Sequence, residues 1–391
     1  MTTQSKVEQS NGSAFQRSEY LGRWDRARRE MVRARLDALL VTNETNYAYF
    51  TGHDTPAWAI KSRPMAFLLP LEAEPVLITA MVAETAAMSP VTEIRSYDGF
   101  EDGARKALSD VIQDDRLTRG RIGCEFGVEQ RLGLPFNEFG KLQAEVPDAE
   151  WLDGSTVLWE LRLHKSPAEV VCMRRAAKIQ SEAYRQLLPH VHAGIRESEL
   201  HRIFVHALVD QGVERPGYVA MHSGEGNYRR VSSWPTDRVL AHGDLWFIDS
   251  GARYRGYWTD FGRTVAVGKP SREQQDYYHI AYSAMRAALE IAGPGLRVSE
   301  LRTAADGVLH QHGIHEKPWA RIGHGIGLDL TEPPSVLPTD DHLLEPGMVL
   351  AIEPRIDMEC GHFQTEEDLV ITDEGYELLS EPQNPSLPEN N

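Results

Sequence analysis

Acidic side chains stand at the ends of apolar, strand-like segments in the second half of this chain. Asp249 ends the run Leu-Trp-Phe-Ile-Asp, Glu353 follows Met-Val-Leu-Ala-Ile, and the acids of Thr-Glu-Glu-Asp at 365–368 lead into Leu-Val-Ile-Thr. Burying an isolated ionised carboxylate is so costly that buried acids are nearly always paired with cations or bound to metals. The chain therefore needs a fold that gathers these strands around a shared cationic partner.

A second aspartate and one histidine extend this set. Asp260 follows Asp249 by eleven residues, with glycines at positions 251 and 256 between them, so a hairpin would place both acids on adjacent strands facing one pocket. His324 lies in Arg-Ile-Gly-His-Gly-Ile-Gly, where glycines let backbone approach closely. Four carboxylates and one imidazole suit a pair of divalent ions, with manganese, iron, cobalt and zinc all compatible. One such acid alone is usually a solvated strand-end residue, but the whole set in this order favours a metal centre.

Composition excludes several other classes of protein. The 391 residues hold 58 acidic and 41 basic side chains, a formal charge of −17, which argues against nucleic acid or an anionic membrane as a partner. The three cysteines are too widely spaced for a disulfide framework or a zinc knuckle, and they fit a reducing compartment. The first 18 residues lack the apolar core of a signal peptide, and no apolar run is long enough to span a bilayer. We therefore expect a cytoplasmic protein.

Alternating helical and strand-like patterns predict an α/β protein of two domains between polar tails. The predicted parts are a mobile tail over 1–18, a smaller α/β domain over 19–160, a larger domain over 161–380 that holds the acids, and a mobile tail over 381–391. In the first domain we expect helices at 20–34, 80–88 and 134–146, and strands at 36–42, 47–51, 75–78 and 123–126. In the second, Ser166, Pro167 and Glu169 form a capping box that opens a long helix. Further helices are expected at 198–211, 272–292 and 298–312.

These motifs resemble those of the pita-bread metallopeptidase family, which includes aminopeptidase P, prolidase, methionine aminopeptidase and creatinase. The matching text is FIDSGARYRGYWTDFGRT, GHGIGLDLTEPP, GMVLAIEP and TEEDLVITDEG, within residues 165–379, and the domain before it resembles the creatinase-type N-terminal domain. The resemblance implies an α+β pita-bread catalytic domain, two divalent metal ions with manganese foremost, and a homodimer. It also implies that the chain is a dinuclear metal-dependent hydrolase cleaving a C–N bond, of the Xaa-Pro peptidase type.

The resemblance implies a specific set of metal ligands. Carried over position by position, they are Asp249, Asp260, His324, Glu353 and Glu366. Glu366 is chosen over Glu367 because it lies six residues before Thr372, as in the closing strand of the family. Glu353 is also implied as the catalytic group that handles the proton of the attacking water.

Three positions depart from the peptidase pattern. Ser232 and Thr331 stand where peptidase members usually carry non-ligand histidines, and Gln364 stands where prolidase-like members often carry arginine. Serine and threonine donate hydrogen bonds but are not charged near neutral pH. These changes leave open a non-peptide hydrolase or a lyase, as in creatinase, ectoine hydrolase and dimethylsulfoniopropionate lyase. A non-catalytic binding module is a third interpretation, although such relatives tend to have lost metal ligands.

Five residues are candidates for binding a small-molecule or short peptide substrate. They are His222, Ser232, Thr331, Trp58 and Arg63. Trp58 and Arg63 lie in PAWAIKSRP of the first domain, which in creatinase-like dimers reaches toward the active site of the neighbouring subunit. An ordinary surface loop is the alternative for that segment, and a structural turn is the alternative for His222 in MHSGEGN.

Overall fold

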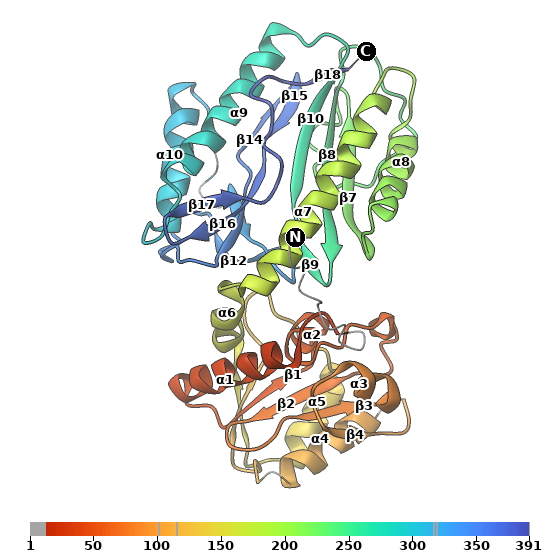
Figure 1. Cartoon of the computed structure of the whole chain (residues 1–391), viewed down its shortest axis with the longest axis vertical. Coiled ribbons are helices and arrows are strands. Elements are labelled where there is room, and N and C mark those ends of the chain that lie inside the picture. The colour runs from red at the N-terminus through yellow and green to blue at the C-terminus, as the bar shows by residue number, and fades with distance from the viewer. Residues whose placement is uncertain (1–12, 101, 115, 316, 318–319, 391) are drawn as a thin grey trace, which may run out of the picture. The chain divides into compact units, whose positions relative to one another are not determined.

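The computed structural model describes residues 13–100, 102–114, 116–315, 317 and 320–390. The chain divides into two compact units, the first ending at Arg162 and the second beginning at Leu163. Each unit mixes helices with β-sheet, which confirms the predicted α/β class (Figure 1). No helix in the described part of the chain has the length and apolar character needed to cross a membrane.

The first unit is built on one six-stranded sheet in the order β4-β3-β2-β1-β5-β6. Its strands are β1 (Ala38–Val41), β2 (Ala66–Pro70), β3 (Val76–Thr79), β4 (Glu93–Ser96), β5 (Arg121–Cys124) and β6 (Glu150–Asp153). Its helices are α1 (Arg17–Ala34), α2 (Glu44–Thr51), α3 (Val82–Met88), α4 (Gly103–Asp114), α5 (Phe136–Glu145) and α6 (Ser155–Leu163), with a 3-10 turn at Pro56–Ala59.

Helices cover both faces of this sheet, so strands β1, β2 and β3 are apolar and buried along their whole length. Leu40 and Leu68 pack with Leu108 of α4 and Leu142 of α5 in one core cluster. On the opposite face, Phe67 stacks on Phe50 of α2, with ring centroids 5.2 Å apart, and meets Trp24 of α1. This is the burial expected for strands with near-continuous apolar runs.

The strand predicted at 47–51 is wrong, because that segment belongs to helix α2. Asn43 caps the helix by accepting a hydrogen bond from the Thr45 amide at 2.9 Å, and Gly52 ends it with φ 72°. Aromatic and β-branched residues favour a strand locally, but burial of Tyr47, Tyr49 and Phe50 decides for the helix. The other predicted elements of this unit occur within a few residues of their expected places.

The second unit contains two five-stranded sheets and one two-stranded hairpin. The sheets are ordered β18-β10-β8-β7, with β9 paired to β8, and β12-β11-β13-β16-β17; the hairpin is β14-β15. Its helices are α7 (Pro167–Leu187), α8 (Glu197–Asp210), α9 (Arg272–Ile291) and α10 (Val298–Gln311), with a 3-10 turn at Leu188–His190. Its strands are β7 (Arg215–Ser223), β8 (Leu245–Tyr254), β9 (Tyr257–Trp258), β10 (Phe261–Val267), β11 (Gly323–Gly325), β12 (Glu332–Ser335), β13 (Val349–Ile352), β14 (Arg355–Met358), β15 (Gly361–Gln364), β16 (Glu367–Thr372), β17 (Gly375–Leu378) and β18 (Glu389–Asn390).

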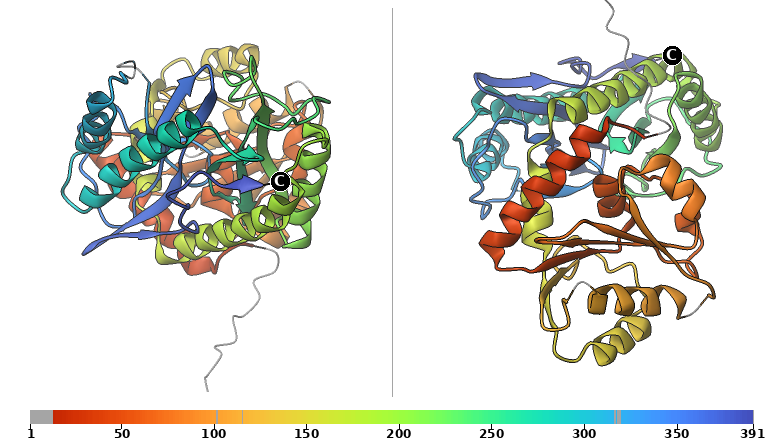
Figure 2. Two further views of the ribbon diagram at one scale, coloured as in Figure 1. Left: turned by 90° about the horizontal axis from the view of Figure 1, so that it is seen from above. Right: turned by 60° about the horizontal axis from the view of Figure 1, so that its bottom comes forward.

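Each five-stranded sheet packs against its own pair of helices. Phe204 of α8 and Trp246 of β8 share a core cluster with Ala183 of α7, while Ala284 of α9 shares another with Leu350 of β13. Figure 2 shows these helix pairs from two further directions. All three helices predicted after 197 are confirmed, and so is the capping box at Ser166 and Glu169. Helices cover one face of each sheet, and the acidic residues belong to the strands of these two sheets or adjoin them.

The end of the chain differs from the mobile tail that we expect from its composition. The Gln383 amide donates to Glu367 Oε1 at 2.6 Å, and Leu387 is buried. Strand β18 pairs in parallel with β10, with Glu389 opposite Ala266. Polar and proline-rich composition thus hides a segment that closes the edge of a sheet. Of the predicted N-terminal tail, residues 1–12 lie outside the described residues, and α1 already begins at Arg17.

Candidate metal centre

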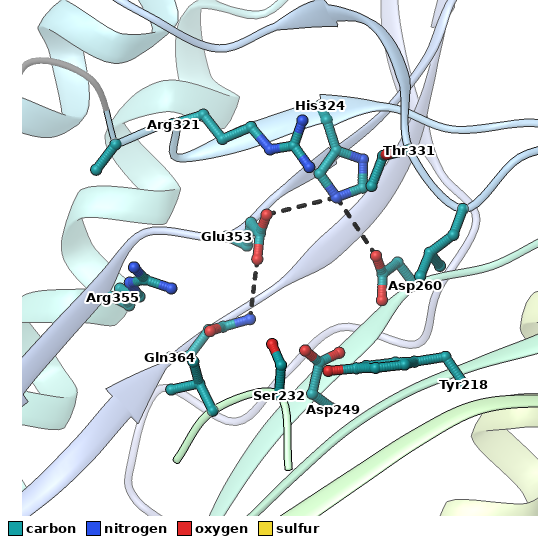
Figure 3. A pocket seen from close by; sticks show the side chains of 13 residues that line it. Tyr218, Ser232, Asp249, Asp260, Arg321, His324, Thr331, Glu353, Arg355 and Gln364 are labelled. Atoms are coloured by element: carbon teal, nitrogen blue, oxygen red, sulfur yellow. Dashed lines mark hydrogen bonds and ion pairs between the residues drawn. The ribbon is translucent and has the colours of Figure 1, made fainter. Parts of the chain in front are cut away.

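Two of the candidate acids come from the sheet that contains β8 and β10. Asp249 lies within β8, opposite Gly262 of β10, and Asp260 immediately precedes β10. Strand β8 continues past Gly251 to Tyr254, and the chain reverses at residues 255–256. As the hairpin prediction requires, two neighbouring strands bring Asp249 and Asp260 together, and both carboxylates face the same pocket (Figure 3).

The other sheet supplies the remaining three side chains. His324 is central in β11, Glu353 follows β13, and Glu366 precedes β16. These strands are neighbours in the order β11-β13-β16, with Gly323 opposite Ile352 and Ile352 opposite Glu367. The site therefore draws on five segments of two separate sheets, and strand pairing aligns the segments within each sheet.

The five side chains form one connected cluster. Oxygens of Asp249, Asp260 and Glu366 all lie within 4.8 Å of each other. His324 Nε2 is 3.4 Å from Asp260 Oδ2 and 3.4 Å from Glu353 Oε1 (Figure 3). The Glu366 Oε1 atom is buried and has no hydrogen-bond partner among the described residues. A buried acceptor without a donor, facing other carboxylates, fits a cation-binding site.

The tautomer of His324 also suits a metal ligand. Its Nδ1 atom is 2.9 Å from the carbonyl oxygen of Gly325, which only accepts hydrogen bonds, so Nδ1 carries the hydrogen. In the neutral ring, Nε2 then presents its lone pair to the carboxylates. A metal-binding histidine typically donates its second N–H to a backbone carbonyl or a carboxylate in this way.

The electrostatics of the cluster call for positive charge. Burial, reinforced by the charges of neighbouring carboxylates, raises the pKa of Asp249 and of Glu366 well above their ordinary values. Burial likewise raises the pKa of Glu353, although the positive charge of His324 opposes the shift. Burial alone would lower the pKa of His324, but its hydrogen bond to Asp260 and the charge of Glu353 raise it. The acids remain ionised together only if cations offset their repulsion.

Surrounding residues hold the backbone of the candidate ligands. Asp368 Oδ2 accepts from the Asp260 amide at 2.9 Å and from Thr259 Oγ1 at 2.5 Å. The carbonyl of Glu366 accepts from Arg263 at 2.7 Å and from Gln383 Nε2 at 2.8 Å. These hydrogen bonds are made by atoms that do not face the pocket, so they fix the two acids without occupying their free oxygens.

Glu366 and Glu367 have different surroundings. Glu367 Oε2 accepts from Ser380 Oγ at 2.5 Å and its Oε1 accepts from the Gln383 amide. Glu367 is therefore used to fix the C-terminal segment, whereas Glu366 belongs to the acid cluster.

A cavity of about 490 Å³ adjoins the cluster. It is lined by Ser232 and Thr331, the two positions where the sequence departs from the peptidase pattern, and by Gln364. Sequence reasoning missed three further polar residues of the lining: Tyr218, Arg321 and Arg355. Burial, with Asp249 adding to it, raises the pKa of Tyr218 to about 12, and its hydroxyl bonds with the Ser232 side chain. Arg321 and Arg355 lie close to motif residues His324 and Glu353 in sequence, which was the available signal.

The remaining candidate residues do not line this cavity. His222 is fully buried and contacts the rings of Phe247 and His362, and burial lowers its pKa to about 3. Trp58 and Arg63 belong to the first unit, where Trp58 packs edge-on against Tyr47 and Arg63 lies 5.5 Å from the centre of the Phe100 ring. Their expected role at the substrate stays a prediction.

Comparisons with known proteins agree with this geometry. Residues 171–373 match the model of metallopeptidase family M24, and residues 23–164 match the creatinase/prolidase N-terminal domain. An Xaa-Pro dipeptidase of Pyrococcus horikoshii is 27% identical over 350 residues, covering 89% of this chain and 93% of that relative. An uncharacterized peptidase of Bacillus subtilis is 27% identical over 354 residues, covering 88% and 94%. The solved structure of an Xaa-Pro dipeptidase from Bacillus anthracis matches with a TM-score of 0.83 and 25% identity, over 95% of this chain and 99% of that one.

The family match covers the whole acid cluster and more than half of the chain, and the two-unit α/β fold agrees with it. The chain therefore belongs to metallopeptidase family M24, a family of metal-dependent hydrolases, and carries an N-terminal domain of the creatinase/prolidase type.

Proposed function

We propose that this protein is an Xaa-Pro-type peptidase that hydrolyses the C–N bond of short peptides with two divalent metal ions. The observation that carries the proposal is the buried cluster of Asp249, Asp260 and Glu366, with His324 beside it. The named activity of the relatives from Pyrococcus and Bacillus anthracis supports the same substrate class. Manganese is the proposed metal, because carboxylate-rich sites with one imidazole suit it.

Each candidate ligand has a proposed place. Asp249, Asp260 and Glu366 would hold the two ions together with His324 and Glu353. When bound, the ions supply an activated water and an electrophile for the peptide carbonyl.

Glu353 is the proposed proton-handling group. Its Oε1 faces His324 and its Oε2 accepts from Gln364 Nε2 at 3.1 Å, so the carboxylate is held at the edge of the cavity (Figure 3). Burial raises its pKa, which brings it closer to the range in which a carboxyl both takes and returns a proton.

Uncharged hydroxyl groups line the part of the cavity where we expect the substrate to bind. Ser232 and Thr331 line the cavity where peptidase members carry imidazoles, and Tyr218 lies beside Ser232. We propose that these hydroxyls orient the substrate carbonyl. The substrate role proposed for Trp58 and Arg63 depends on a homodimer of the creatinase type. The wide spacing of the three cysteines is compatible with the proposed cytoplasmic location.

The direct test is turnover of Xaa-Pro dipeptides and tripeptides by manganese-loaded protein. The expected result is release of the N-terminal residue, lost in Glu366→Gln together with bound manganese. The matched control is Glu367→Gln, which removes a neighbouring carboxylate but is expected to retain metal and activity. Absence of turnover on every Xaa-Pro peptide, with metal bound, would contradict the proposal.

The altered shell also favours a second candidate function, a non-peptide hydrolase or lyase on the same centre. Its basis is the loss of both imidazoles at Ser232 and Thr331. If it is right, the Ser232→His and Thr331→His double variant fails to improve the native reaction. A gain in that reaction would favour the peptidase instead.

A further inference from the structure

Gln364 stands between two of the proposed metal ligands and a buried histidine. Its Nε2 atom lies 3.1 Å from Glu353 Oε2 and 3.4 Å from Glu366 Oε2 (Figure 3). Ionised carboxylates only accept hydrogen bonds, so the amide NH₂ group must face them. The amide oxygen then faces the other way, toward His362 Nε2 at 3.3 Å. Its neighbours thus determine which way the amide points.

The same reasoning determines the hydrogens of His362. Its Nδ1 atom lies 2.5 Å from Asp357 Oδ1. The histidine is fully buried, whereas the Asp357 side chain is 39% exposed. Burial raises the pKa of Asp357, but the hydrogen bond and the charge of His362 outweigh this effect, so the pKa of Asp357 is below its ordinary value. An ionised carboxylate and an amide oxygen both accept, so both ring nitrogens of His362 must donate, and the ring is an imidazolium.

The β14-β15 hairpin aligns these groups. Asp357 is the cross-strand partner of His362, and His362 and Gln364 are two residues apart on β15, so both side chains leave the same face. The carboxylate, the imidazolium and the amide therefore form a continuous hydrogen-bonded row that ends at Glu353 and Glu366.

A second imidazole beside the row stays neutral. His222 of β7 lies against His362, with ring centroids 5.4 Å apart, and neither of its ring nitrogens has a hydrogen-bond partner among the described residues. Burial, reinforced by the charge of His362, lowers the pKa of His222. The positive charge of this aromatic cluster is thus on His362, which is the ring with a carboxylate partner.

We propose that Asp357, His362 and Gln364 form a positioning relay that holds Glu353 and Glu366 in their metal-binding orientations, with both ring nitrogens of His362 donating hydrogen bonds. The part concerning metal rests on the proposed function. In this relay a neutral amide touches the acids, and the positive charge sits one side chain further back.

Metal affinity of three variants tests the relay. Gln364→Met and His362→Phe are each expected to weaken manganese binding by about 10- to 100-fold, measured by calorimetric titration of metal-free protein. Because His362 acts through Gln364, the double variant is expected to bind no more weakly than Gln364→Met alone. Additive losses would overturn the relay. The control His342→Phe removes an exposed histidine with a similar contact, 2.6 Å to Asp340, and is expected to leave affinity unchanged.

Nitrogen-15 NMR of the histidine rings tests the proposal on the unaltered protein and requires no substrate. We expect both ring nitrogens of His362 to be protonated near neutral pH, and Asp357→Asn to leave one of them without hydrogen. One unprotonated nitrogen in the unaltered protein would overturn the proposal.

Kinetics separate the relay from the proposed function. If the peptidase assignment holds, Gln364→Met lowers kcat while KM changes little, because the relay touches Glu353 rather than substrate. A change in KM with kcat unaltered would count against the relay. The two proposals can also fail separately. If the losses of manganese affinity are non-additive and both ring nitrogens of His362 are protonated, but no Xaa-Pro peptide is cleaved, the relay is supported and the peptidase function is rejected.

Discussion

At the scale of single residues, the acid cluster is packed so closely that one neighbouring position has room only for hydrogen. A Cβ atom at Gly262 would lie 2.6 Å from Glu366 Oε2 and 2.7 Å from Gln364 Nε2. Both contacts are shorter than van der Waals separation, so the side chains would have to move. The glycine therefore sets how near β10 comes to the acids.

We expect Gly262→Ala to displace Glu366 and to weaken manganese binding, with a loss of about 1–3 kcal/mol in the free energy of unfolding. Calorimetric metal titration and urea denaturation measure the two effects. Gly307→Ala is the control, because a Cβ at that position in α10 meets nothing within 4 Å, and we expect it to be neutral or slightly stabilising. Unchanged metal affinity in Gly262→Ala would show that the acids adapt freely.

At the scale of elements, local capping signals located helices better than residue type did. The Ser166 side chain accepts from the Glu169 amide at 3.3 Å, and Glu169 Oε2 accepts from the Ser166 amide at 2.7 Å. The sequence alone predicts this reciprocal pair, and α7 begins at the position that the pair indicates. At 47–51 the aromatic and β-branched residues suggested a strand, yet Asn43 and Gly52 were available there as caps. Strand propensity mainly reflects packing on a half-buried surface, so it misleads where a helix is buried on several sides.

Removing the cap is expected to cost stability alone. Ser166→Ala should lower the free energy of unfolding by about 1 kcal/mol while leaving metal binding intact, and Ser271→Ala at the equivalent box of α9 should cost a similar amount. Urea denaturation followed by circular dichroism provides the measurement. Loss of metal in Ser166→Ala would mean that the start of α7 shapes the site.

At the scale of whole units, the first unit contains a buried carboxylate of its own. Glu125 is buried and accepts four hydrogen bonds, from the amides of Thr42 and Asn43, the Thr42 hydroxyl and Asn46 Nδ2. Burial nevertheless raises its pKa from 4.5 to about 7, against the effect of those donors. The loop that follows β1 is thus held by an acid whose ionisation is unfavourable in the folded state.

This acid predicts a pH dependence for the first unit. Because the pKa of Glu125 is higher in the folded than in the unfolded state, the folded unit binds more protons between about pH 4.5 and pH 7. The contribution of Glu125 to stability is therefore lost as pH rises through that window, by about 3 kcal/mol at one pKa unit per 1.4 kcal/mol. Amide hydrogen exchange in β1, compared between the native chain and Glu125→Gln at pH 5 and pH 8, measures it. Glu93→Gln, an exposed acid of the same sheet, is the control, and an equal pH dependence in native and Glu125→Gln protein would refute the prediction.

The sequence by itself determined which residues could form a metal centre, because carboxylates in apolar strands cannot stay buried without cations, and it determined the family through five motif positions. It also located most helices, since caps and amphipathic spacing are local. Only the tertiary structure decided that Tyr218, Arg321 and Arg355 share the cavity, that His222 is buried outside its lining, and that residues 381–390 close a sheet edge. The Asp357–His362–Gln364 row likewise exists only through the register of one hairpin. Strand pairing joins residues that are distant in the chain, and no local pattern records which partner a strand will choose.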